Sequence, residues 1–351
     1  MPKLVTPLNT AYPQGNAFRY MTAAQSAAVA AGNLRGLDVT DALVNAISTG
    51  VPVFLPDGYY PITRSLNPSG IRQFQLHGNP YKSQIINRAR TADTPTLVLT
   101  DCLYFVVSGI VLGGRAGFRN DGLLINTAGG SHTGFGVFND VCIESNGNGI
   151  ELQKCNTIQF NRVSYWPSNG IGGILNTCDK GTRKHAVLAR GSVEGNFSNE
   201  ITLNACNLTG IDKTIDGHAS VSITTPTLGG TQLVRLIDCE LENTPIVLEN
   251  IFNPQIDGCY LDQCSITLKR CRYGSIKDCF NPRSISLLGC QNIAIQNLAQ
   301  GNVGSTLTID KTCLNCALIN ASLVTLIDNG AHTTLLNWNL QGAAQRDKLN
   351  T

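Results

Sequence analysis

A short sequence pattern recurs through the second half of the 351-residue chain, and it limits the possible folds more than any other feature. Its clearest copies alternate apolar and polar residues ahead of a bend, at residues 236–241, 256–261, 276–280 and 295–299. One position of the pattern is occupied by Cys239, Cys259, Cys279 and Leu298, which follow one another at intervals of 20, 20 and 19 residues. A repeat of this period is typical of a solenoid of stacked structural units.

A second ladder has the same period. Pairs that end in an apolar residue recur at spacings of 20, 19 and 22 residues, at Val247-Leu248, Thr267-Leu268, Ser286-Leu287 and Thr308-Ile309. About twenty residues are too few for a βαβ unit, which needs thirty or more. They suffice for one coil of short strands and polar turns, with the parallel strands of successive coils about 4.8 Å apart. The sequence therefore predicts an all-β solenoid, a parallel β-helix.

The composition agrees with an all-β fold and narrows the range of partners. Only 14% of the residues are charged, while glycine reaches 35 residues, a balance typical of turn-rich β structure rather than of helical bundles. The net charge of +2, without a run of Lys or Arg, gives no electrostatic footprint for nucleic acid. No apolar stretch is long enough to span a membrane. We expect no nucleic-acid partner, no membrane insertion, and synthesis and folding in the cytoplasm.

The thirteen cysteines are predicted to be reduced packing residues. Nothing in the sequence indicates secretion, and the first ladder puts Cys239, Cys259 and Cys279 on one inward-facing stack, whose parallel side-chain directions disfavour disulfides. Cys313 and Cys316 form an isolated C-x-x-C without a second pair or a nearby histidine, and the five histidines are scattered. We expect no metal site and no cofactor.

Residues 38–50 predict a helix that caps the first coil of the solenoid. Asp38 or Thr40 can serve as N-cap and Gly50 can end the helix, while its apolar residues fall on one face. Residues 51–60 then predict a strand and a turn. The alanine-rich segment 23–31 predicts a further short helix.

This opening resembles a known family. The segment Thr40-Asp41-Ala42-Leu43, followed by Gly50-Val51-Pro52-Val53-Phe54-Leu55-Pro56-Asp57-Gly58-Tyr59-Tyr60, resembles the start of the pectate-lyase-type β-helix of bacteriophage tailspikes and polysaccharide-degrading enzymes. The resemblance is specific over residues 37–63, and the repeat extends it to about residue 340. It implies a right-handed parallel β-helix with an N-terminal capping helix. The expected divisions are an extended N-terminal arm over 1–36, the β-helix over 37–340 and a polar C-terminal tail over 341–351.

The resemblance also implies a function. A short tailspike is a virion structural protein that binds the polysaccharide of the host cell surface and assembles as a homotrimer. Its N-terminal arm would dock to other virion proteins, and an ordinary disordered terminus is the alternative for that segment. Two other functions stay open: an active polysaccharide depolymerase, either glycoside hydrolase or lyase, and a non-catalytic decoration protein of the particle.

The repeat becomes irregular between residues 165 and 232, so we expect long loops and the functional surface near this region. A glycoside hydrolase needs two carboxyl groups that flank the scissile bond. The ladder assigns Glu194 and Glu240 to comparable outward positions, which makes them the predicted catalytic pair. The alternative is that both are solvated surface carboxylates.

Glycan binding needs aromatic rings for the apolar faces of sugars and polar groups for their hydroxyls. The predicted glycan-binding residues lie in or beside the irregular region, and they are Tyr165, Trp166, Arg183, His185, Glu242, Tyr260 and Asp262. The basic residues among them would suit an acidic polysaccharide. In the alternative interpretation, an exposed Tyr260 or Phe280 only stacks along its own ladder.

Overall fold

The structure is a computed structural model in which part of the chain is described. The described residues are 8–91, 94–113, 121–129, 132–145, 148–167, 185–190, 198–208, 219–228, 230–242, 245–299, 305–323, 325–336 and 339–340. The chain divides into two compact units, Met1–Arg183 and Lys184–Thr351, which we call unit 1 and unit 2. Both units are built from short parallel strands, so the predicted parallel β-helix is confirmed.

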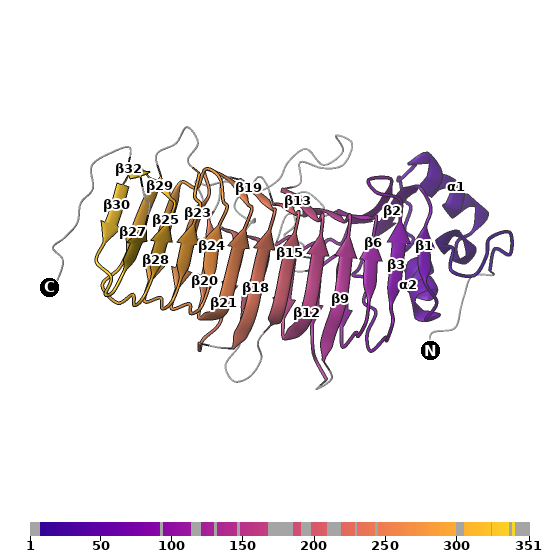
Figure 1. Cartoon of the computed structure of the whole chain (residues 1–351). Coiled ribbons are helices and arrows are strands. Elements are labelled where there is room, and N and C mark those ends of the chain that lie inside the picture. Colours follow the sequence, from indigo (N-terminus) through magenta and orange to yellow (C-terminus); the bar gives the residue numbers. More distant parts are fainter. Residues whose placement is uncertain are drawn as a thin grey trace. The chain divides into compact units, whose positions relative to one another are not determined.

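The strands of unit 1 form three parallel faces, A, B and C, which the chain visits in turn (Figure 1). Face A consists of β1 (Val53–Leu55), β3 (Gln75–Gly78), β6 (Val106–Ser108), β9 (Thr133–Asn139) and β12 (Cys155–Asn161). Face B consists of β2 (Gly58–Ile62), β4 (Ser83–Asn87), β7 (Val111–Gly113), β10 (Cys142–Ser145) and β13 (Ser164–Pro167). Face C consists of β5 (Leu97–Thr100), β8 (Leu123–Asn126) and β11 (Ile150–Gln153).

Unit 2 repeats the three faces with its own strands. Face A consists of β15 (Asn199–Asn204), β18 (Thr231–Ile237), β21 (Ile251–Asp257), β24 (Ser275–Lys277), β26 (Ala294–Gln296), β28 (Ala317–Ile319) and β31 (Thr334–Leu336). Face B consists of β16 (Asn207–Leu208), β19 (Glu240–Glu242) and β22 (Tyr260–Asp262). Face C consists of β14 (His185–Arg190), β17 (Ala219–Thr224), β20 (Ile246–Glu249), β23 (Ser265–Lys269), β25 (Ser284–Leu288), β27 (Thr306–Ile309) and β30 (Thr325–Asp328). A further pair joins β29 (Ser322–Leu323) to β32 (Asn339–Leu340).

The N-terminal segment belongs to the cap of unit 1. Both predicted helices are present, as α1 (Ala23–Ala31) and α2 (Thr40–Ser48), and a 3₁₀ helix, η1 (Ala17–Tyr20), precedes them. Val39 occupies the N-cap position of α2, while the carboxylate of Asp38 accepts hydrogen bonds from the backbone N–H (2.9 Å) and the hydroxyl (2.5 Å) of Thr40. The cap covers the apolar end of the first coil, which a solenoid otherwise exposes.

An extended arm over residues 1–36 is wrong for the part that the structure describes. The described residues of this segment that are buried are Gly15, Ala17, Phe18, Tyr20, Met21, Ser26 and Val29. The backbone of Asn16 pairs in parallel with that of Phe54 in β1, and α1 contacts β2. The apolar residues among the polar ones drive this segment onto the first coil, because burying them removes apolar area from water.

One residue in the left-handed conformation makes the bend into face A of successive coils. We call this set the A-bend column; it comprises Gln73, Tyr104, Phe135 and Thr157 in unit 1, and Glu200, Leu233, Asn253, Tyr273, Asn292, Asn315 and His332 in unit 2. Their φ angles lie between 51° and 61°. Positive φ is uncommon outside glycine, and asparagine adopts it more readily than most residues. A bend of one residue lets two strands follow each other without a loop.

The predicted thiol stack is confirmed and is longer than expected. In unit 2, Cys206 aligns with Cys239, and Cys259 and Cys279 continue the row inside the coil. All twelve cysteines that the structure describes are buried and free of disulfides. Contact with the neighbouring thiol and burial together raise the pKa of Cys239 and of Cys259, so these side chains are protonated packing residues.

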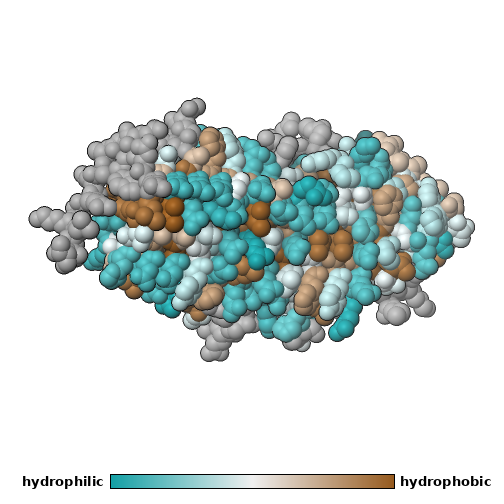
Figure 2. Space-filling model, in the orientation of Figure 1, coloured by the Kyte–Doolittle hydropathy of each residue, from teal (hydrophilic) through white to brown (hydrophobic). Residues whose placement is uncertain are grey.

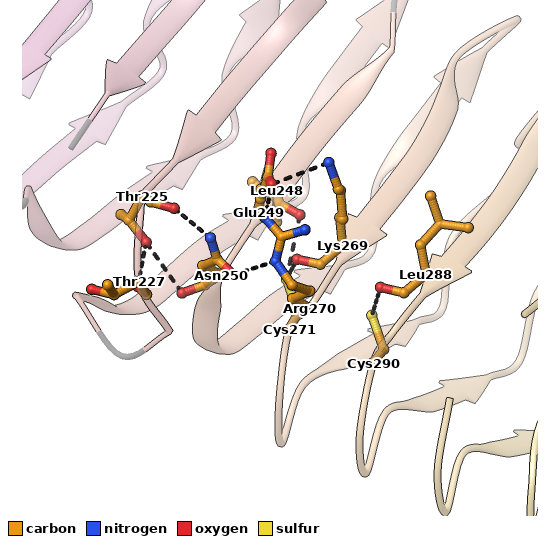
Figure 3. Close-up of polar contacts among 10 residues, drawn as sticks. All are labelled: Thr225, Thr227, Leu248, Glu249, Asn250, Lys269, Arg270, Cys271, Leu288 and Cys290. Carbon is orange, nitrogen blue, oxygen red and sulfur yellow. Dashed lines mark hydrogen bonds and ion pairs between the residues drawn. The ribbon is translucent and has the colours of Figure 1, made fainter. Parts of the chain in front are cut away.

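Asn250 holds three consecutive coils of unit 2 together at the bend that follows face C (Figure 3). Its side chain is 3% exposed, and its amide nitrogen donates to the carbonyl oxygen of Thr225 at 2.5 Å. Its amide oxygen accepts from Nε of Arg270 at 2.8 Å. Beside it, the carboxylate of Glu249 forms ion pairs with Arg270 and, at 3.2 Å, with Lys269. This network joins the ends of β17, β20 and β23.

The described helices are short. None of them has the length and apolar character that crossing a membrane requires.

Candidate functional site

The outer surface of face B in unit 2 gathers the largest group of predicted site residues. Strands β16, β19 and β22 lie side by side and place Asn207, Glu240 and Tyr260 at one register position. A backbone bridge continues this row to Phe280. The neighbour of Glu240 in the preceding coil is Asn207, and the predicted place of Glu194 in this row stays untested because Glu194 lies outside the described residues. We call this surface the acidic–aromatic face.

The two aromatic residues of this face are open to solvent and lie against each other. The rings of Tyr260 and Phe280 have centroids 5.7 Å apart and an interplanar angle of 16°. They are 40% and 42% exposed, so each keeps ring surface for a ligand. Sugar C–H groups pack favourably on such surface.

Three carboxylates lie beside the rings. Glu242 aligns with Asp262 in the next coil, and Glu240 lies two residues before Glu242 on the same side of β19. Neighbouring strands are about 4.8 Å apart, and two residues along a strand span about 6.6 Å. Asn207 donates its amide N–H to a carboxylate oxygen of Glu240 at 2.8 Å, which fixes that side chain.

Glu242 is the carboxyl group of this face with an altered proton affinity. Partial burial, followed by the negative charges of Glu240 and Asp262, raises its pKa above the ordinary value. Desolvation and like charges both disfavour the ionised form. A carboxyl group that keeps its proton to higher pH can act as a general acid, while the neighbouring carboxyl oxygens can accept hydrogen bonds from sugar hydroxyls.

The structure therefore unites four of the predicted residues, Glu240, Glu242, Tyr260 and Asp262. Trp166 lies on β13 of unit 1, in register with Glu144, and His185 begins β14 of unit 2; the side chains of Trp166 and His185 are outside the described part of the structure. Glu194 and Arg183 lie outside the described residues altogether.

Tyr165 cannot contribute a ring to an outer surface. It is fully buried, because it stands in register with the buried Ile143 and Leu112 on the inward side of face B. The predicted glycan-binding role of Tyr165 is therefore wrong. The signal was present in the sequence, since the residue after an outward Ser164 must face the core.

Unit 1 contains a carboxyl pair that the sequence does not reveal. Asp121 is buried, and its two oxygens accept from the backbone N–H of Asn148 at 2.6 Å and from its amide at 3.3 Å. The same amide nitrogen donates to Glu151 at 3.3 Å. Burial, together with the hydrogen bond and the charge of Glu151, raises the pKa of Asp121 to about 7. The carboxyl group of Asp121 therefore keeps its proton to near-neutral pH.

Comparisons with known proteins identify solved structures with a similar fold. The sequence matches no known protein family and no curated protein. Among solved structures, the chain is similar to PfbA, a surface adhesin of Streptococcus pneumoniae, with a TM-score of 0.58, 11% identity, and coverage of 89% of this chain and 91% of that one. It is similar to the A-module of the mannuronan C-5 epimerase AlgE6 of Azotobacter vinelandii, with a TM-score of 0.56, 13% identity, and coverage of 88% and 92%.

The Dettilon tailspike protein is also similar, with a TM-score of 0.54, 13% identity, and coverage of 95% of this chain and 68% of that one. At these identities the likeness concerns the fold. The chain has the tailspike-like parallel β-helix fold that the opening sequence resembles. The three similar proteins differ in their described roles, so the role of this chain must be argued from its own surfaces.

Proposed function

We propose that this protein binds a cell-surface polysaccharide through the acidic–aromatic face of unit 2. One observation carries the proposal: the exposed, stacked rings of Tyr260 and Phe280 adjoin Glu240, Glu242 and Asp262 on a single surface. The rings provide apolar contact area and the carboxylates accept hydrogen bonds from hydroxyl groups. The combination suits a glycan with free hydroxyls.

Removing one ring should weaken glycan binding without unfolding the protein. We expect Tyr260→Ser to reduce affinity about tenfold, which corresponds to roughly 1.4 kcal/mol of lost contact energy. The measurement is binding to an array of bacterial surface glycans, followed by calorimetric titration with the best ligand. Tyr81→Ser is the matched control, since Tyr81 is 64% exposed and lies on unit 1. Equal affinity of Tyr260→Ser and the unaltered protein would contradict the proposal.

The raised pKa of Glu242 favours cleavage of the glycan as a second function of the same face. The backbone positions of Glu240 and Glu242 are about 6.6 Å apart along the strand, and inverting glycosidases need a separation of about 6.5–9.5 Å between their two carboxyl groups. Glu242 would donate the proton and Glu240 would activate water. The pair of Glu194 and Glu240 is the other possible assignment.

Reducing-end release from the bound glycan tests cleavage. We expect Glu242→Gln to lower the rate by at least about a hundredfold, because a general acid contributes about that factor or more, while binding persists. Two further variants are measured in parallel. A loss of reducing-end release in Glu194→Gln would identify Glu194 as the general acid instead. Asp278→Asn is the control and should leave the rate unchanged. If the unaltered protein releases no reducing ends and forms no unsaturated product absorbing in the ultraviolet, the face only binds.

The likeness of fold to a tailspike supports a proposal for the wider role. We propose that the chain is a virion protein of a phage, that it acts in host attachment, and that it assembles as a homotrimer whose N-terminal segment docks to other virion proteins. A non-catalytic decoration protein is the competing role. Light scattering of the purified protein should give three times the mass of one chain; a monomer at micromolar concentration would contradict the trimer.

A further inference from the structure

Face A of unit 1 presents an outer surface without ionised side chains. On the described strands β3, β6, β9 and β12, the outward positions carry amides, hydroxyls, apolar groups and His77, whose pKa is lowered by burial so that its ring is neutral. Face A of unit 2 differs, since Arg235, Asp257 and Lys277 lie at its outward positions. Figure 2, which looks onto face A, shows hydrophobic side chains gathered over β6 and β9 among hydrophilic ones.

Tyr104 and Phe135 form the aromatic part of this surface. Their ring centroids are 5.0 Å apart with an interplanar angle of 15°, and the side chains are 54% and 46% exposed. Both belong to the A-bend column, where L-residues pay a steric cost of about 1–2 kcal/mol for positive φ. Asn253, Asn292 and Asn315 make the same bend in unit 2. The bend therefore does not require aromatic residues, and their exposed rings need another explanation.

Ordered polar groups lie farther along the same strands, where Ser108 and Asn139 follow the ring residues by four positions, about 13 Å. The amide of Asn161 donates to the amide oxygen of Asn139 at 3.0 Å, and a ring nitrogen of His77 lies 2.7 Å from the hydroxyl of Ser108. A carboxamide has two N–H donors and two acceptor lone pairs, so Asn139 has capacity for a ligand beyond this bond. The hydrogen bonds between neighbours hold these groups in place before any ligand arrives.

We propose that this surface, formed by Tyr104, Phe135, Val106, Val137 and Asn139, binds neutral saccharides. The rings and two valines match the C–H face of a sugar, and the amides match its hydroxyls. The apolar part consists of two rings and two valines, whereas a stable protein interface uses about 20–30 residues a side, which argues against a protein partner. The site lies on unit 1, and none of its residues belongs to the acidic–aromatic face of unit 2.

Asparagine substitutions test the site while preserving the bend. Tyr104→Asn combined with Phe135→Asn removes both rings and introduces the residue that unit 2 already uses in the A-bend column. We expect the unaltered full-length protein to bind members of an array of neutral glycans, and the double variant to lose at least about tenfold in affinity. Tyr81→Asn is the control, because Tyr81 also has positive φ (62°) and is exposed but lies off this surface.

Tyr260→Ser separates the two sites, since it should leave neutral-glycan binding intact. Two results would overturn the inference: no binding of any neutral glycan by the unaltered protein, or equal binding by the double variant. A change of oligomeric mass in the double variant with unchanged glycan binding would instead identify a subunit contact and would also overturn it.

Discussion

Replacing Asn250 with alanine is expected to lower the free energy of unfolding by about 3 kcal/mol. The substitution removes two side-chain hydrogen bonds, leaves the buried carbonyl of Thr225 and Nε of Arg270 without their partner, and puts alanine at a φ of 60°. Each of these effects costs about 1 kcal/mol or more. The midpoint of urea denaturation measures the loss.

Asn315→Ala is the matched control. Asn315 has nearly the same φ, 54°, but its side chain is exposed. We expect it to lose only the conformational part, about 1 kcal/mol. If the two variants were equally destabilised, the buried hydrogen bonds of Asn250 would contribute nothing net, and Asn250 would not hold the three coils together.

The stability of unit 1 should fall as the pH rises from about 4 to 7 and above. The folded-state pKa of Asp121, about 7, exceeds its ordinary value of 3.8, so the folded protein binds a proton more tightly than the unfolded chain does. This stabilisation is complete below the unfolded pKa and is lost as the pH passes through the folded one. Three pKa units correspond to as much as about 4 kcal/mol. Urea midpoints at pH 4, 6 and 8 measure the dependence.

Asp121→Asn should abolish this dependence and make the protein more stable than the unaltered one at pH 8. Its amide cannot ionise and still accepts a hydrogen bond from Asn148. Asp140→Asn is the control of opposite sign: Asp140 is ion-paired with Arg162, whose hydrogen bonds lower the pKa of the carboxyl. The ion pair's contribution to stability is already complete above about pH 4. The fall in stability between pH 6 and 8 should therefore persist in Asp140→Asn. A flat profile in the unaltered protein would contradict the raised pKa of Asp121.

The regular coils could be predicted from the sequence because every ladder position repeats the same environment. The alternation around Cys239, Cys259 and Cys279 fixed the inward side, and the outward row of Glu240, Tyr260 and Phe280 followed from it. The N-terminal segment could not be placed in the same way. Its prolines and glycines are typical of an arm, and nothing local shows that Phe18 and Met21 pack on the first coil.

The candidate site was predictable only where the period held. Glu240, Glu242, Tyr260 and Asp262 lie in regular coils, and the structure brings them together. Asp121 and Glu151 escaped prediction because they are 30 residues apart in coils that depart from the twenty-residue period, so no ladder aligned them. Their coupling depends on burial and on Asn148, which are properties of the folded coil.

The A-bend column carries Gln, Tyr, Phe, Thr, Glu, Leu, Asn and His on nearly the same backbone. Since one conformation accepts so many side chains, the residue there can change while the strands on either side keep their register. Each coil thus offers one interchangeable position at a pitch of about 4.8 Å. Single substitutions in this row can therefore change the exposed surface of the protein during evolution while the backbone of the coils stays the same.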